Sequence, residues 1–171
     1  MSNVLLQKVE FQTEENALGT WQRYLSAGGR YYAEFKSHRR MFGMPLLHYT
    51  HGRNPRTGRR TIAVGVVAVG RIAVGVFPVG QVAIGLCPVG QLSLGLIFGI
   101  GQLATGVAAI GQLALGVLFG AGQFATGYIA IGQFALGFYA LGQVAVGAHV
   151  FSMKVKDAAA RHFFHFLFGG G

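Results

Sequence analysis

Residues 71–90 read RIAVGVFPVGQVAIGLCPVG, and these two decapeptides decide the fold. Each decapeptide divides into two halves of the form apolar, small, apolar, Gly, variable. Similar units run from residue 61 to residue 150, some with an inserted residue. Repetition at a short fixed period is typical of a solenoid, in which each unit packs only on its neighbours.

A bundle of transmembrane helices is the main alternative, because hydropathy alone favours it. Ten residues turn a helix by roughly 1000°, so each Gln and Gly would drift about 80° around the helix per repeat. A Gly at every fifth position would also destabilise a helix by about 1 kcal/mol each relative to Ala. The sequence therefore predicts an all-β repeat: a narrow, two-sided β-solenoid with about 10 residues per coil. We expect Gly at the coil corners, where it can take φ values that other residues avoid.

Strand geometry divides each coil into inward and outward side chains, because residues two apart share a face. With the large apolar residues inside, Ile72 and Val74 point inward from one wall and Phe77 and Val79 from the other. The outward columns then consist of small residues such as Ala73 and Pro78. This assignment predicts two flat faces that are almost free of side chains, against which neighbouring sheets can pack closely.

The residues after each Gly predict two different edges. One edge is a glutamine ladder, whose stacked amides can bond to each other; it comprises Gln81, Gln91, Gln102, Gln112, Gln123, Gln133 and Gln143. The other edge is apolar and is a candidate for self-association; it comprises Val66, Val76, Leu86, Leu96, Val107, Val117, Tyr128 and Phe138.

Two units, QLSLGLIFGIG (91–101) and QLALGVLFGAG (112–122), each contain an extra residue. Each precedes a coil with a Thr, Thr105 or Thr126, in an aliphatic position. We interpret them as matched bulges. Either the extra residue is absorbed at a corner or the chain has a local kink or pocket there. Pro78 and Pro88 fit the strand pattern poorly, because proline lacks the N–H of a ladder donor.

The flanks differ from the repeat, so the chain divides into a basic cap (1–60), the solenoid (61–150) and an aromatic tail (151–171). The cap is predicted to be α/β, with a short strand between Val4 and Phe11 and a helix over residues 13–26 whose apolar set is Leu18, Trp21 and Leu25. In the tail, Asp157 is the expected N-cap of a short helix that ends at Phe168.

Charge lies almost entirely in these flanks. The formal net charge is +9, yet residues 61–150 contain Arg71 as their one charged residue. A basic patch in the cap could cover the solenoid end or bind an anionic lipid surface. We do not expect nucleic acid as its partner, because no nucleic-acid fold signature accompanies the patch. The patch comprises Arg39, Arg40, Arg53, Arg56, Arg59 and Arg60.

The tail has a similar ambiguity, since it can pack on the last coil or lie in a membrane interface. It is too short to span a bilayer. Its candidate anchor residues are Lys154, Lys156, Arg161, Phe163, Phe164, Phe166, Leu167 and Phe168.

The composition gives no support for an enzyme. The repeat contains no Asp, Glu or Lys and one His, so no acid–base or nucleophile–base pair can be built there. His38, His48 and His51 lack Cys or carboxylate partners in the pattern of a metal site. We therefore expect no catalytic residue, metal, cofactor or small-molecule substrate. Without a signal-peptide pattern, the expected location is the cytoplasm or the inner face of the cytoplasmic membrane.

The segment GMPLLHYTHGRNPRTGRR (43–60), followed by repeats such as GQFATGYIAIGQFALGFYALGQ (122–143), resembles a group of uncharacterised, mostly bacterial proteins. They join a G-x-P-L-x-H segment and an N-P-x-T-G turn to G-Q-x-A-x-G repeats, and the similarity covers about residues 43–147. More loosely, the chain resembles the bactofilins, which are polymerising β-solenoids. Insect antifreeze solenoids are a weaker comparison, because their regular Thr ranks are absent here.

These observations predict a structural protein that self-assembles into filaments, sheets or bundles, alone or on a membrane. Its partner would be a second copy of itself, with anionic lipid as a further partner. A peripheral membrane protein that lies on a bilayer without polymerising is the alternative, and an integral helical membrane protein is the third interpretation.

Overall fold

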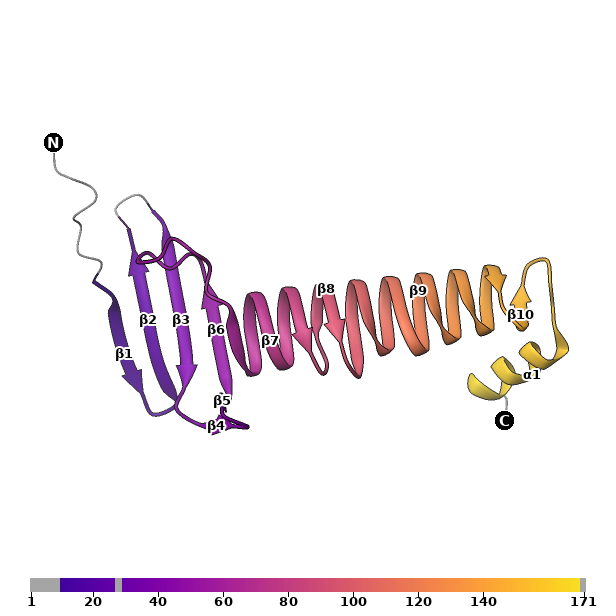
Figure 1. Cartoon of the computed structure of the whole chain (residues 1–171), viewed down its shortest axis with the longest axis horizontal. Helices are drawn as coiled ribbons and strands as arrows, with labels where there is room; N and C mark the ends of the chain where they lie inside the picture. The colour runs from indigo at the N-terminus through magenta and orange to yellow at the C-terminus, as the bar shows by residue number, and fades with distance from the viewer. Residues whose placement is uncertain (1–9, 27–28, 170–171) are drawn as a thin grey trace. The chain divides into compact units, whose positions relative to one another are not determined.

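The computed structural model describes residues 10–26 and 29–169, in two compact units, Met1–Gln81 and Val82–Gly171. The predicted solenoid is present: stacked coils of roughly ten residues each, formed from strands (Figure 1). The repeat region is therefore not the helix bundle that hydropathy favours. Each unit is described by itself below.

The N-terminal unit begins with an antiparallel sheet of β1 (Gln12–Asn16), β2 (Gly19–Leu25), β3 (Tyr31–Ser37) and β6 (Leu47–His51). A small ribbon of β4 (Arg40–Met41) and β5 (Met44–Pro45) lies in the connection between β3 and β6. Strand β6 then pairs in parallel with β7 (Ala63–Gly85), which starts the solenoid. The sheet thus continues into the first coil and covers its strand edge.

The predicted helix over residues 13–26 is wrong: these residues form β1 and β2, and the helices and strands described in residues 10–26 and 29–60 are all strands. Leu18 lies in the β1–β2 turn and Leu25 near the end of β2, both largely exposed, so they share no apolar helical face with Trp21. Trp21 instead packs across the sheet on Phe35, with ring centroids 4.9 Å apart, and on Tyr49. Of the expected strand between Val4 and Phe11, residues 4–9 lie outside the described residues.

In the second unit, β8 (Val89–Gly95), β9 (Phe98–Val146) and β10 (His149–Ser152) are parallel turns of one winding. Tyr139 is paired with His149, ten residues later, and Leu141 with Phe151. Each coil therefore stacks on the preceding coil with equivalent positions in line. The hydrogen bonds of the sheet join successive coils.

The interior of the coils is the reverse of the predicted one. Ala73 and Pro78 point inward and are fully buried, whereas Val79 and Phe77 are exposed. The same holds along the stack, where one buried column contains Ala83, Ser93, Ala104, Ala114, Ala125 and Ala135 and the other contains Pro88, Ala109, Ala130 and Ala140.

Coil length explains this inversion. Ten residues at about 3.3 Å each give a perimeter of about 33 Å, and two walls at an ordinary sheet spacing of about 10 Å would use about 20 Å of it at the edges. Too little chain would remain for the walls themselves. The walls must therefore lie closer together, and only Ala, Gly, Ser or the flat ring of Pro fits between them.

The glycines are required by close stacking more than by backbone conformation. A Cβ on Gly75 would overlap the carbonyl oxygen of Gly65, and one on Gly111 would overlap that of Gly101. Among the repeat glycines that the structure describes, only Gly106 and Gly127 have positive φ, 158° and 155°, close to extended backbone. The expectation of unusual corner φ values is therefore wrong for most of these positions.

The first of the two eleven-residue coils absorbs its extra residue at a corner. The N–H groups of Ile97 and Phe98 both donate to the carbonyl of Leu86, at 3.0 and 3.1 Å, so two residues oppose one. The pairing of Val89 with Ile100 then continues the stack with an offset of eleven. Gly99 and Gly120 take the interior positions that Ala or Pro has in other coils. Thr105 and Thr126 are half-buried.

The C-terminal helix α1 (Ala158–Leu167) confirms the prediction for the tail, including its N-cap. A carboxylate oxygen of Asp157 accepts the N–H of Ala159 at 2.9 Å, and its other oxygen lies 2.8 Å from Nδ1 of His149. Phe163 stacks on Tyr139 with ring centroids 4.0 Å apart, and Phe164 is buried. The helix is thus fixed to the last coils.

Candidate functional surfaces

The solenoid exterior is apolar because the small residues occupy the interior. The predicted apolar edge lies mostly on the surface: Leu96 is 70% exposed and Val117 is 69% exposed. Val66 is an exception, being buried in the N-terminal unit, and Val76 is half-buried. Both flat faces add to this surface, since they expose side chains such as Leu115 and Ile100. The predicted side-chain-free faces are therefore wrong, and the apolar exterior extends well beyond one edge.

Aromatic side chains gather on the coils near the C-terminal end of the second unit. Phe124 stacks on Phe134 with centroids 4.7 Å apart, and Tyr128 stacks on Phe138 at 5.0 Å. These rings lie at equivalent positions of successive coils and are exposed. Coils nearer Val82 carry aliphatic side chains at the same positions.

The glutamines form one exposed column in the second unit, from Gln91 to Gln143, and Gln81 is exposed in the N-terminal unit. They follow a column of glycines whose backbones stack directly, such as Gly101 and Gly111. No hydrogen bond joins the side-chain amides of these glutamines in the described part of the chain. The column exists as predicted, whereas the predicted bonding along it does not.

The tail divides its predicted anchor residues between two roles. Phe163 and Phe164 pack on the last coils, as described above, whereas Phe166 is 80% exposed and Leu167 and Phe168 are also exposed. Lys154, Lys156 and Arg161 are exposed as well. Lys156 forms an antiparallel bridge with Phe151 of β10, so chain after the last coil covers its edge.

The predicted basic patch is split by the topology of the N-terminal sheet. Arg39 and Arg40 follow β3, while Arg53, Arg56, Arg59 and Arg60 follow β6. Because β3 and β6 are antiparallel, these two sets lie at opposite ends of the strand pair. The structure therefore contains two basic regions rather than one continuous patch.

The larger basic region forms around an ordered loop. Asn54 Oδ1 accepts the N–H of Arg56, and the N–H of Gly58 donates to the carbonyl of Asn54. Arg56 lies over the ring of Phe11, 4.7 Å from its centroid. Partial desolvation and the nearby charges of Arg71 and Arg53 lower the pKa of Arg60, so positive charge is concentrated here.

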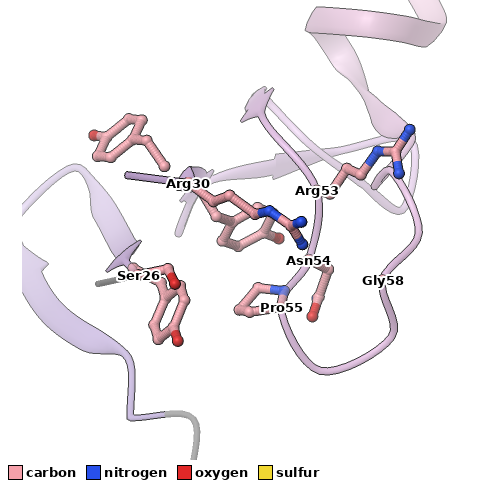
Figure 2. Close-up of a pocket in the computed structure, with 9 residues that line it drawn as sticks. Ser26, Arg30, Arg53, Asn54, Pro55 and Gly58 are labelled. Atoms are coloured by element: carbon pink, nitrogen blue, oxygen red, sulfur yellow. The ribbon is translucent and has the colours of Figure 1, made fainter. Parts of the chain in front are cut away.

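A cavity of about 650 Å³ opens beside this loop, lined by Tyr24, Tyr32, Arg30 and residues 53–55 among others (Figure 2). Arg30 extends toward Asn54, whereas the guanidinium of Arg53 points away from it (Figure 2). The guanidinium of Arg30 is a charged donor of the kind that bonds to carboxylate or phosphate oxygens.

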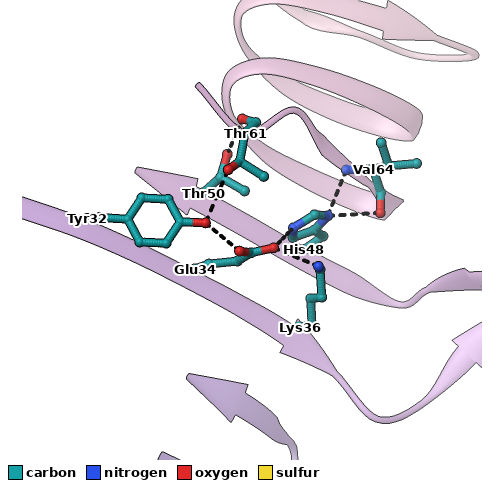
Figure 3. Close-up of polar contacts among 7 residues, drawn as sticks. All are labelled: Tyr32, Glu34, Lys36, His48, Thr50, Thr61 and Val64. Atoms are coloured by element: carbon teal, nitrogen blue, oxygen red, sulfur yellow. Dashed lines mark hydrogen bonds and ion pairs between the residues drawn. The ribbon is translucent and has the colours of Figure 1, made fainter. Parts of the chain in front are cut away.

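A buried polar network joins the N-terminal sheet to the first coil (Figure 3). His48 Nε2 lies 3.1 Å from Oε1 of Glu34, and Val64 N–H donates to His48 Nδ1 at 2.8 Å. The Tyr32 hydroxyl donates to the other carboxylate oxygen of Glu34 and lies 3.1 Å from the hydroxyl of Thr61. Lys36 completes the set with an ion pair to Glu34 of 2.7 Å.

This network shifts two pKa values. The hydrogen bond from His48, with those from Lys36 and Tyr32, lowers the pKa of Glu34 from 4.5 to about 2 against the opposing effect of burial. Burial, followed by the hydrogen bond to Glu34, raises the pKa of Tyr32 to about 12. Each group is therefore held in its ordinary charge state, Glu34 ionised and Tyr32 neutral, which is a structural role more than a catalytic one.

Sequence reasoning missed this network, although a signal was present. Glu34 is the one acid among residues 30–60, which contain eight Lys and Arg, and a lone acid in such a segment invites a search for its partners. The histidines considered for metal binding lie apart: His38 is near Glu15 and Thr20, and His51 packs on Tyr31. No group of three or more potential metal ligands occurs in residues 10–26 and 29–169.

These features define a class of protein: a β-solenoid with a small-residue interior and an apolar exterior. In the N-terminal unit an antiparallel sheet pairs with the first coil, and in the second unit a helix packs on the last coils. Comparison of the chain with protein-family models, curated proteins and solved structures finds no match. Among the described residues, no helix has the length and hydropathy needed to cross a membrane.

Proposed function

We propose that this chain is a non-enzymatic structural protein whose solenoids associate side by side through their apolar exterior. The observation that supports the proposal is the inverted coil, which places Ala inside and Leu, Ile, Val and Phe outside. Contiguous apolar surface of this extent is typical of a contact surface. The fold is compatible with such a role, because a stack of coils is stiffened by hydrogen bonds between every pair of neighbours.

Lateral contact is favoured over head-to-tail stacking. Unpaired strand edges of a solenoid occur only at its first and last coils, where they could pair with another chain. In the N-terminal unit β6 pairs with the first coil, and in the second unit the Phe151–Lys156 bridge and α1 cover the last. A filament built by strand pairing would have to displace these segments.

Sedimentation velocity of the purified full chain over a range of concentrations tests the proposal. We expect oligomers, and we expect the triple variant Leu96→Gln/Val117→Gln/Leu118→Gln to shift them toward monomer, since all three side chains are exposed on the solenoid. The matched control is Leu18→Gln, which removes an equally exposed Leu from the cap and should leave the oligomers unchanged. A wild-type monomer at every concentration, in water and in detergent, would contradict the proposal.

Attachment to a membrane through α1 is a second candidate, favoured by the exposed Phe166 and Phe168 beside Arg161. Apolar and basic residues on one short helix suit the interface of an anionic bilayer. Co-sedimentation with phosphatidylglycerol vesicles should weaken in Phe166→Ser/Phe168→Ser and persist in the control His162→Ser, an exposed residue of the same helix. Equal binding of both variants would remove this candidate.

A further inference from the structure

The second unit combines four properties that together point to one environment for its apolar exterior. We propose that the solenoid from Val82 to Ser152 crosses the hydrocarbon core of a lipid bilayer with its stacking axis along the membrane normal. The inference rests on the proposed use of the apolar exterior as a contact surface and names what covers it, namely lipid acyl chains.

The first property is that each coil is apolar on almost every side. No Lys, Arg, Asp or Glu occurs between Arg71 and Lys154. In a typical coil the outward side chains are apolar except for one Gln, as in Val82, Ile84, Leu86 and Val89 with Gln91. A surface for one protein partner would need an apolar patch on one side, whereas lipid contacts every side.

The second property is that the backbones of successive coils are hydrogen-bonded to each other. An unpaired N–H or C=O in hydrocarbon costs several kcal/mol, so a spanning segment must satisfy its backbone internally. The coils do this along the stacking axis, since each coil is paired with the next, as in the pairing of Val89 with Ile100 and Tyr139 with His149. Strand edges of a stack lie at its ends, where the membrane surfaces would be, and the Phe151–Lys156 bridge covers the edge of the last coil.

The third property is length. The equivalent positions Val82, Leu92, Leu103, Leu113, Phe124, Phe134 and Val144 mark successive coils of this unit. Six steps of about 4.8 Å separate the first from the last, or about 29 Å. The hydrocarbon core of a bilayer is about 30 Å thick. The coils of the second unit therefore match one bilayer thickness.

The fourth property is the distribution of groups that prefer the interface. Exposed aromatic rings lie on the coils nearest the C-terminal end, including Tyr128 and Phe138, and Lys154 and Lys156 follow directly. Helix α1, with Arg161 and exposed Phe166, comes next. Aromatic residues followed by cations are typical of a segment that leaves the hydrocarbon for the headgroups.

The glutamine column is the one polar strip on this surface. Its amides lie one coil apart and have no side-chain hydrogen bonds in the described part of the chain. In lipid they would bond along the column or to the column of a second copy, as polar side chains do between membrane-embedded helices. Lateral association within the bilayer then accounts for both the apolar exterior and its single polar edge.

A depth measurement on the full chain tests the inference. Cys87 is the single cysteine, so Cys87→Ser provides a background for Val82→Cys, Leu113→Cys and Val144→Cys, each labelled with bimane and reconstituted into phosphatidylcholine–phosphatidylglycerol vesicles. Nitroxide lipids with the quencher near the headgroup or at the acyl-chain end report depth. We expect the ratio of deep to shallow quenching to be several-fold higher at Leu113 than at either end.

Equal ratios at all three positions would mean that the solenoid lies on the surface, and would overturn the inference. No quenching at any position, together with water-soluble oligomers in sedimentation, would overturn it while leaving the proposed self-association intact. Circular dichroism of each variant checks the fold. Polarised infrared spectroscopy of the unmodified chain gives an independent result: carbonyls that bond along the stack should align with the membrane normal, and in-plane carbonyls would contradict spanning.

Discussion

His48 Nε2 lies 3.1 Å from Glu34 Oε1, and both side chains are buried. Because Nδ1 of the same ring accepts the N–H of Val64, the ring hydrogen lies on Nε2, and Nε2–H donates a hydrogen bond to the ionised carboxylate. Val64 belongs to the first coil, His48 to β6 and Glu34 to β3. One imidazole therefore ties the first coil to two strands of the sheet that covers it.

Glu34 should make the stability of the N-terminal unit sensitive to acid. Its pKa is about 2 in the folded chain against an ordinary 4.5, so the unfolded chain binds more protons between these values. The stabilisation is complete above about pH 4.5 and is lost as the pH falls toward 2. Urea unfolding at pH 6, 4 and 2.5 should show this loss, and Glu34→Gln should flatten it. Glu14→Gln, at an exposed carboxylate, should keep the wild-type slope; a flat wild-type profile would contradict the assignment.

Gly111 should tolerate no side chain. A Cβ there would overlap the carbonyl oxygen of Gly101 in the preceding coil, so backbone must move to admit it. We expect Gly111→Ala to lower the free energy of unfolding by several kcal/mol, on the order of the largest single-residue effects. Gln112→Ala, at the exposed neighbouring position, should change it by less than about 1 kcal/mol. Equal effects in thermal unfolding would show that the coils are not stacked this closely.

Ala114 and Leu115 give a direct test of which residues point inward. Ala114→Leu would place three more carbons in an interior made of Ala and should destabilise by about 1–3 kcal/mol or more. Leu115→Ser, on the exterior, should be tolerated within about 1 kcal/mol. If circular-dichroism melts show Leu115→Ser to be more destabilising than Ala114→Leu, the large residues point inward and the assignment is wrong.

Ser93 should be a stability defect of the interior column. Its hydroxyl is fully buried and has no hydrogen-bond partner, a state that costs about 1–3 kcal/mol. Ser93→Ala restores the residue found at equivalent positions such as Ala83 and Ala104, so it should raise the melting temperature. Ala83→Ser serves as the reverse control and should lower it. A lower melting temperature for Ser93→Ala would mean that the hydroxyl is bonded.

The sequence determines the coil period but leaves the direction of the side chains open. Alternation puts Ala73 on the face opposite Ile72 and Val74, and either face satisfies the pattern. Choosing the large residues as core follows the usual rule for soluble proteins, which fails here because a ten-residue perimeter has no room for them. The bulge corners and the N-cap at Asp157 are local features, and they could be predicted from adjacent residues.

The secondary structure of the cap was less predictable, because contacts between residues far apart in the sequence determine it. Trp21 contacts Phe35 and Tyr49 only when β2, β3 and β6 assemble into the sheet. The packing of these rings outweighs the local preference of residues 13–26 for a helix. The Glu34–His48 contact likewise joins residues fourteen positions apart. No local spacing indicates that these two side chains meet.

An interior of Ala, Gly, Ser and Pro makes every coil nearly interchangeable, since no coil needs a partner of complementary shape. Gain or loss of ten residues by recombination between repeats would add or remove one complete coil. The segments that cover the first and last coils would keep their contacts. The number of coils in the solenoid can therefore change one coil at a time during evolution. The outward residues lie outside this interior, so they can change without altering how the coils stack.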